Sequence, residues 1–145
     1  MNHLSNADRR ERWLERLQAS GYRLTTPLKI IVDILTDSPR ALDALQLFDL
    51  GRQKYPRMGL VTVYRALDKL EELGLVQRVH REEGCHAYLR AAEGHEHLLL
   101  CTRCGRGVFF AGDDLTLLFE KVARQSGYRI EEHWLQLYGL CENCQ

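Results

Sequence analysis

The sequence predicts an α+β protein, and three of its features carry that prediction. Apolar residues recur at helical spacing in four successive segments between residues 8 and 73. Alternating apolar residues follow between residues 76 and 89, which is typical of two paired strands. The second half holds two Cys-x-x-Cys pairs, in the segments CTRCG and CENC. A chain of 145 residues suits one ordinary domain or two small ones.

The first two helices are predicted from apolar stripes and from their boundary residues. Residues 8–19 combine an apolar stripe with many charges, and Gly21 ends that helix. The second helix begins with Thr26 as its cap and Pro27 at the first helical position. A strongly apolar stripe follows, so this helix is predicted to lie in the core until residues 38–39 end it.

The next two helices have the arrangement of a helix-turn-helix. The third is predicted from Leu42 to about Tyr55, where Pro56 intervenes, and residues 57–59 form a short connector. The fourth helix, residues 60–73, has one apolar face at spacings of three and four and one polar face. A helix, a tight connector and a helix that starts with polar side chains can place those side chains in the DNA major groove.

A two-stranded wing is predicted after the fourth helix. Val76 and Val79 precede a polar turn at residues 82–84, and Ala87 and Leu89 follow it. The four helices and this hairpin together predict a winged helix. By pattern alone such a module suits DNA binding or another interaction about equally well.

Charge is distributed unevenly, although the formal net charge is zero. Residues 1–81 carry 14 Lys and Arg against 10 Asp and Glu, whereas residues 82–145 carry 6 against 10. This asymmetry only weakly suggests nucleic-acid binding in the first half, because many solvated surfaces carry as much charge. The charged start and the lack of an apolar run of roughly 18 residues predict a cytoplasmic protein with no membrane partner.

The two Cys-x-x-Cys pairs predict one structural zinc site. Two such knuckles supply the four thiolates of a tetrahedral site, which leaves no open position for water or a substrate. Thirty-six residues separate the pairs, so the metal would join the two ends of a folded unit. The alternative is two disulfides, which a reducing cytosol disfavours. The predicted zinc ligands are Cys101, Cys104, Cys141 and Cys144.

The residues also resemble a known family. LVTVYRALDKLEELGLV, read with GYRLTTPLK upstream and with GHEHLLLCTRCG and LYGLCENC downstream, resembles the ferric uptake regulator family of bacterial metal-responsive repressors. The resemblance implies a winged-helix DNA-binding domain, a hinge and an α/β dimerisation domain, which we expect at residues 1–83, 84–94 and 95–145. It also implies a homodimer, a metal that switches DNA affinity and no small-molecule substrate. A two-fold dimer predicts a near-palindromic double-stranded DNA operator.

The resemblance implies DNA contacts at the start of the fourth helix. Tyr64 and Arg65 match the TVYR positions that contact operator DNA in the family, and Thr62 lies beside them. Tyrosine suits a thymine methyl group and a sugar, and arginine suits guanine or phosphate. The alternative for Tyr64 is a place at the rim of the core. Weaker candidates for phosphate contacts, each of which is otherwise simply solvated, are Arg23, Lys29 and Arg57.

Four histidines and the remaining cysteine lie within 18 residues and predict a regulatory divalent metal. Imidazole with thiolate suits Zn2+, whereas a carboxylate-rich set suits Fe2+ or Mn2+, which remain the alternatives. By resemblance to the family, His95, His97 and His133 converge on one ion. Its fourth ligand is open, and the candidates are Glu96, Asp113, Asp114 and water.

A second regulatory site is implied at the hinge, where the wing offers His80, Cys85 and His86. Neighbouring strand residues face opposite sides, so we expect Cys85 and His86 not to share an ion, and we favour Cys85. A cysteine in this region is similar to the zinc-uptake branch of the family. The alternative for Cys85 is a small buried apolar residue.

We therefore interpret the chain as a zinc-responsive repressor of metal-uptake genes. An iron-responsive regulator and a peroxide sensor, in which bound iron oxidises a nearby histidine, share this fold and remain alternatives. An enzyme is not expected, because the four-thiolate site is closed and the H-x-E motif of zinc deaminases is absent.

Overall fold

The structure is a computed structural model of the chain, and it describes residues 4–81, 84–112 and 115–145. Its contacts divide the chain into two compact units, one up to Ala91 and one from Ala92 onward. This division falls within residues 84–94, the segment predicted to hold the end of the wing and the hinge. No helix in the described ranges is long and apolar enough to cross a membrane.

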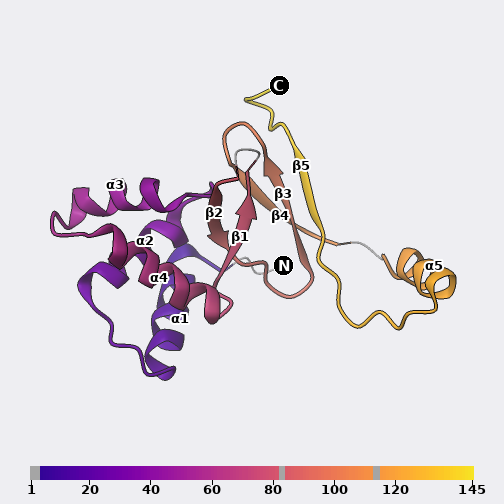
Figure 1. The fold of residues 1–145 in the computed structure, drawn as a ribbon, viewed down its shortest axis with the longest axis horizontal. Helices are drawn as coiled ribbons and strands as arrows, with labels where there is room; N and C mark the ends of the chain where they lie inside the picture. Colours follow the sequence, from indigo (N-terminus) through magenta and orange to yellow (C-terminus); the bar gives the residue numbers. More distant parts are fainter. Residues whose placement is uncertain (1–3, 82–83, 113–114) are drawn as a thin grey trace. The chain divides into compact units, whose positions relative to one another are not determined.

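The first unit is a group of four helices followed by a hairpin (Figure 1), so the predicted α+β class is confirmed. β1 and β2 pair antiparallel. Residues 82–83, which belong to the predicted turn of the wing, lie outside the described residues. The elements are α1 (Asn6–Ala19), α2 (Thr26–Asp37), α3 (Ala44–Lys54), α4 (Leu60–Glu72), β1 (Val76–His80) and β2 (His86–Arg90).

Local capping decides where the helices begin, and it corrects two predicted boundaries. The cap of α2 is Thr25, whose hydroxyl accepts from the Leu28 N–H at 3.4 Å, so the prediction of Thr26 was wrong by one residue. Helix α3 begins after Asp43, which forms a capping box with Gln46. The predicted start at Leu42 was therefore two residues early.

Leu42 instead extends the hairpin. Its N–H donates to the Tyr88 carbonyl at 2.9 Å, and the Tyr88 N–H donates back to the Leu42 carbonyl at 2.8 Å. The Arg81 guanidinium also donates to the Ala41 carbonyl at 2.7 Å and lies 3.8 Å from the Asp43 carboxylate. The hairpin is thus fastened directly to the start of α3.

One apolar core fixes the orientation of α4 within the first unit. Val63, Leu67 and Leu70 are fully buried, and Ala66 lies on the same face, as the spacing predicts. Leu73, which the same spacing places on this face, is the C-cap and is only partly buried. Each buried leucine or valine contributes about 1.5–3 kcal/mol relative to exposure, so the buried face holds the opposite face towards solvent.

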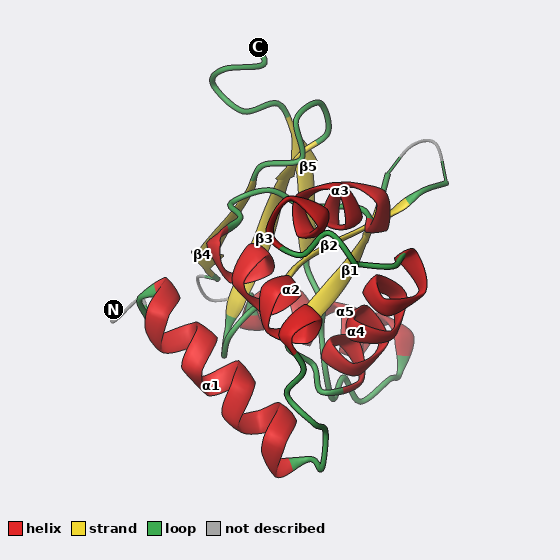
Figure 2. Ribbon diagram, turned by 90° about the vertical axis from the view of Figure 1, so that its left-hand side faces the viewer, coloured by secondary structure: helices red, strands yellow, loops and turns green. Residues whose placement is uncertain are grey.

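The second unit is a three-stranded sheet with one helix, visible as strands and helix in Figure 2. The strand order is β4-β3-β5, with β3 antiparallel to β4 and parallel to β5. Helix α5 has no buried residue. The elements are β3 (Glu96–Cys101), β4 (Gly107–Ala111), α5 (Thr116–Ser126) and β5 (Gln136–Gly139).

Candidate metal centre and DNA-contact helix

The sheet of the second unit brings the two cysteine pairs together. Cys101 is the last residue of β3, and the parallel register places it opposite Gly139, two residues before Cys141. Each knuckle turns tightly: the Gly105 N–H donates to the Cys101 carbonyl, and the Cys144 N–H donates to the Cys141 carbonyl. The pairing of β3 with β5 therefore delivers both knuckles to the same end of the sheet.

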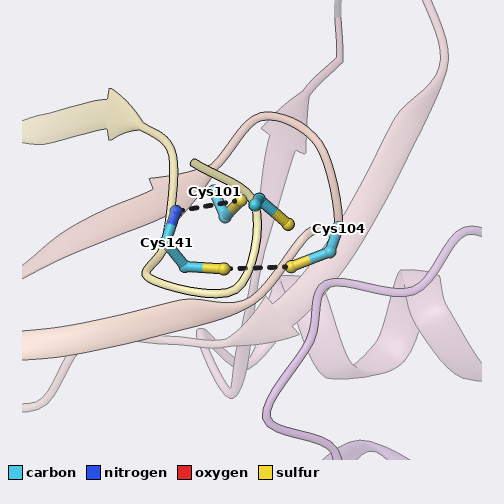
Figure 3. A group of neighbouring side chains, drawn as sticks. Cys101, Cys104 and Cys141 are labelled. Atoms are coloured by element: carbon cyan, nitrogen blue, oxygen red, sulfur yellow. Dashed lines mark hydrogen bonds between the residues drawn. The ribbon is translucent and has the colours of Figure 1, made fainter.

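The four sulfur atoms form one compact group. The side chains of Cys101, Cys104 and Cys141 point towards one another in Figure 3. The four sulfur atoms lie within 4.8 Å of one another, and the sulfurs of Cys104 and Cys141 are 3.7 Å apart. Ligands at the zinc–sulfur distance of about 2.3 Å in a tetrahedron lie about 3.8 Å from each other. All four are free thiols, so the disulfide alternative is not found.

The thiols of this group differ in their ease of ionisation. Backbone N–H donors, from Cys104 first and then Cys141, lower the pKa of Cys101 to about 6. A hydrogen bond with Cys141, with burial and its other sulfur neighbours, raises the pKa of Cys144 to about 12. The Cys101 thiolate therefore forms readily, whereas four thiolates so close together repel one another. A bound divalent cation would offset that repulsion. This donor set can hold Zn2+.

The structure brings together two of the three histidines predicted to share an ion. The His97 and His133 ring centroids are 5.4 Å apart, and Phe110 and Phe119 pack beside them. His97 is buried on β3, whereas His95 is exposed. Within the described ranges, the four cysteines are the one group of three or more metal-binding side chains whose ligand atoms lie this close. Convergence of all three histidines therefore stays a prediction.

The proposed fourth ligands are not all visible. The Glu96 carboxylate accepts from the Glu93 N–H at 3.1 Å. Asp113 and Asp114 lie outside the described residues. Gly112, which precedes them, is packed so closely against His97 that a Cβ atom there would overlap the imidazole ring.

The two histidine side chains of the wing also lie close together, whereas Cys85 lies one residue before β2. His80 and His86 are register partners, and their ring centroids are 4.9 Å apart. Cys85 is an exposed free thiol, so the alternative of a small buried residue is wrong. Our preference for Cys85 over His86 stays a prediction.

The start of α4 carries the predicted DNA contacts on its solvent side. Tyr64 is 48% exposed, Arg65 is exposed and Thr62 is partly exposed. The three weaker candidates, Arg23 before α2, Lys29 on α2 and Arg57 before α4, are all exposed. Val61, which the motif did not single out, is 63% exposed and lies three residues before Tyr64. Helical spacing places it on the Tyr64 face, and that signal was available from the sequence.

Comparison with known proteins identifies the family of this chain. A family model described as the ferric uptake regulator family matches residues 19–138. The chain belongs to the ferric uptake regulator family. A ferric uptake regulation protein of Neisseria meningitidis is 33% identical over 134 residues, covering 91% of this chain and 92% of the relative. Its counterpart in Bordetella parapertussis is 34% identical over 131 residues, covering 89% and 94%.

Solved structures of ferric uptake regulator relatives share the whole fold. A zinc-bound manganese uptake regulator matches with a TM-score of 0.70 at 28% identity, covering 89% of this chain and 98% of that chain. The Vibrio cholerae ferric uptake regulator matches with a TM-score of 0.67 at 28% identity, covering 88% and 98%. A zinc uptake regulator complexed with zinc and DNA matches with a TM-score of 0.68 at 23% identity, covering 97% and 95%, which shows the fold alone.

Membership in the ferric uptake regulator family settles the class of function. The chain is a metal-responsive, DNA-binding regulator and not an enzyme. The four helices and hairpin of the first unit match the winged helix expected from that resemblance, and the second unit has the expected mixed α and β composition.

Proposed function

We propose that this protein is a zinc-responsive repressor that acts in the cytoplasm as a homodimer and controls metal-uptake genes. The observation that carries the zinc assignment is the chemistry of the donors that the structure groups. His97 and His133 offer imidazole nitrogen, and the four cysteines offer sulfur. Thiolate suits Zn2+, imidazole suits Zn2+ as well as Fe2+, and Mn2+ prefers oxygen donors, so the two donor types together favour Zn2+.

The four cysteines would hold a structural zinc. They join the end of β3 to the segment after β5, so the metal would stabilise the sheet of the second unit. A closed four-thiolate site contributes to folding and offers no position for a substrate.

A regulatory metal would use His97 and His133, with further ligands among His95, Glu96, Asp113 and Asp114. His80, Cys85 and His86 on the wing form the second candidate group. A metal stabilises the conformation that it binds more tightly, so a site present only in the DNA-binding state would raise the population of that state. The fold would contribute by holding these histidine, cysteine and carboxylate side chains in position.

The second unit supports a homodimer through its exposed apolar side chains. Leu117, Tyr128 and Trp134 are each more than 70% exposed, which is costly for an isolated unit. Closed two-fold pairing is the commonest way to cover such side chains. A two-fold dimer would present two α4 helices to half-sites about one helical turn apart, or a multiple of it, on a near-palindromic operator.

The exposed face of α4 would contact the operator. Thr62, Tyr64 and Arg65 would reach base edges and the sugar-phosphate backbone of one half-site. Arg23, Lys29 and Arg57 would contact phosphates, so binding should weaken steeply with salt.

The test is a metal titration of operator binding. The full-length dimer is titrated with Zn2+, Fe2+ and Mn2+ while binding to a labelled duplex is followed by fluorescence anisotropy. Zinc should induce binding at the lowest free-metal concentration. A response to Fe2+ at lower free concentrations than to Zn2+ would refute the zinc assignment and leave the family function intact.

An iron-responsive regulator is the second candidate, because the curated relatives at 33–34% identity are named ferric uptake regulation proteins. A peroxide sensor is the third. It would lose operator binding irreversibly when the iron-loaded protein is treated with peroxide, whereas a zinc-responsive repressor would not.

A further inference from the structure

An exposed valine lies on the solvent face of α4. Within the described part of the first unit, four large apolar side chains are exposed, and two of them, Val61 and Tyr64, lie on this helix. Val61 is the more exposed of the two, at 63%. It is the second residue of α4, and the cap before that helix is Gly59, which has no side chain to cover it.

Folding does not favour valine at this position. Its side chain is excluded from the core, so it gains little from burial. A β-branched residue also loses rotamer freedom in a helix, where alanine is preferred. The valine therefore contributes little to the stability of the first unit on its own.

Val61 shares its face with the predicted DNA-contact residues. Spacings of three and four place Tyr64 and Arg65 beside it on the helix surface. Arg57 lies just before the helix, so positive charges flank the valine on both sides, as a phosphate-lined groove requires. Asp68, seven residues further along, is the first acid on this face and lies about 10 Å away along the helix axis.

The chemistry of the major groove offers one apolar partner for such a side chain. The C5 methyl group of thymine is the apolar group on the base edges there, and short apolar side chains contact it. In helix-turn-helix proteins the N-terminal residues of the second helix reach the base edges. Val61 occupies that end of α4.

We propose that Val61 contacts a thymine methyl group in the major groove and so makes this protein prefer thymine at one position of each half-site. This inference rests on the proposed DNA-binding role of α4 and adds a specificity-determining residue to it. Tyr64 and Arg65 would position the helix and contact other bases of the half-site. Val61 would recognise its base pair through van der Waals contact with the methyl group.

The test pairs a protein change with the removal of one methyl group from DNA. The metal-loaded full-length protein first selects a duplex from a randomised library. Each thymine of that duplex is then replaced, one symmetric pair at a time, by deoxyuridine, which lacks only the methyl group. Binding of wild type, Val61→Ala and the control Leu45→Ala is measured for every duplex.

Leu45 is a matched control, because it is 60% exposed near the start of α3 and is likewise an aliphatic side chain outside the core. Val61→Ala retains good helix propensity, so a loss of binding is not a loss of folding. Circular dichroism and metal content check that both variants are intact.

At one thymine pair, wild type and Leu45→Ala should lose about fourfold in affinity per half-site on methyl removal, the factor that corresponds to one buried methyl group. Val61→Ala should bind the unmodified duplex more weakly and should lose less affinity than wild type when deoxyuridine replaces thymine at that pair alone. An unchanged deoxyuridine profile in Val61→Ala overturns this inference and leaves the proposed function standing. If the wild-type protein enriches no duplex, both fail.

Discussion

Gly112→Ala should weaken metal binding at the proposed regulatory site by displacing His97. A Cβ atom at position 112 would overlap the His97 imidazole, closer than side-chain contacts in proteins allow. The ring has little room to retreat, because it is buried between Phe110, 5.6 Å away by centroids, and His133, 5.4 Å away. The imidazole must therefore leave its present position if the backbone stays in place.

The displacement should cost metal affinity, because loss of a ligand's positioning typically weakens binding about 10–100-fold. The assay is competition between the protein and a chromophoric zinc chelator, with total zinc measured by mass spectrometry. Gly112→Ala should keep one tightly bound zinc per subunit at the cysteines and bind the second with reduced affinity.

Gly139→Ala is the matched control, because it is the same substitution in the same unit with nothing within 4 Å of the added atom. Equal affinity of the two variants for the second metal would refute the reasoning. Loss of both metals from Gly112→Ala alone would mean that Gly112 supports the fold of the unit and not the site.

Three further predictions concern the cysteines and the DNA-contact helix. Cys101→Ser should release the structural zinc and dissociate the dimer, as measured by metal analysis and ultracentrifugation; a zinc-loaded dimeric variant would contradict the structural role. Zinc affinity should rise with pH between about pH 6 and pH 8, because Cys144, with its raised pKa, gives up a proton on binding. Below about pH 6 protonation of Cys101 should also favour release, and a pH-independent affinity would exclude this view. Arg65→Ala should weaken operator binding by about 1–3 kcal/mol with unchanged metal content, and normal binding in anisotropy would remove Arg65 from the contact set.

Local patterns predicted most of the first unit. The spacing of Val63, Ala66, Leu67 and Leu70 gave the buried face of α4, because one apolar core determines which face turns inward. The errors lie at boundaries where neighbouring residues compete. Thr25 and Thr26 can both cap a helix, and the structure uses Thr25, which leaves Pro27 in the first turn.

Leu42 shows what local pattern cannot predict. Its apolar side chain fits the periodicity of α3, yet its backbone pairs with Tyr88, 46 residues away. Hydrogen bonds between distant segments leave no periodic signal in either segment. The predicted helix therefore began two residues too early.

The candidate metal sites show the same contrast. Each Cys-x-x-Cys pair is a local turn, so its spacing alone predicted a four-cysteine site. The pairing of β3 with β5 then brings the two turns together. His97 and His133 come from separate segments, and their meeting depends on tertiary packing, whereas His80 and His86 face each other across the hairpin. The structure pairs His97 with His133, as the resemblance implied, and pairs His80 with His86, although we favoured Cys85 over His86 at the wing.

The backbone bridge between Leu42 and Tyr88 also bears on solubility. A hairpin has two outer edges whose unpaired N–H and C=O groups can recruit strands from other molecules. Here Leu42, before α3, makes two backbone hydrogen bonds with Tyr88 on the edge of β2. The Arg81 guanidinium also donates a hydrogen bond to the Ala41 carbonyl. Part of that edge is thereby closed to intermolecular β-pairing, so disruption of the bridge should make the protein more prone to aggregate.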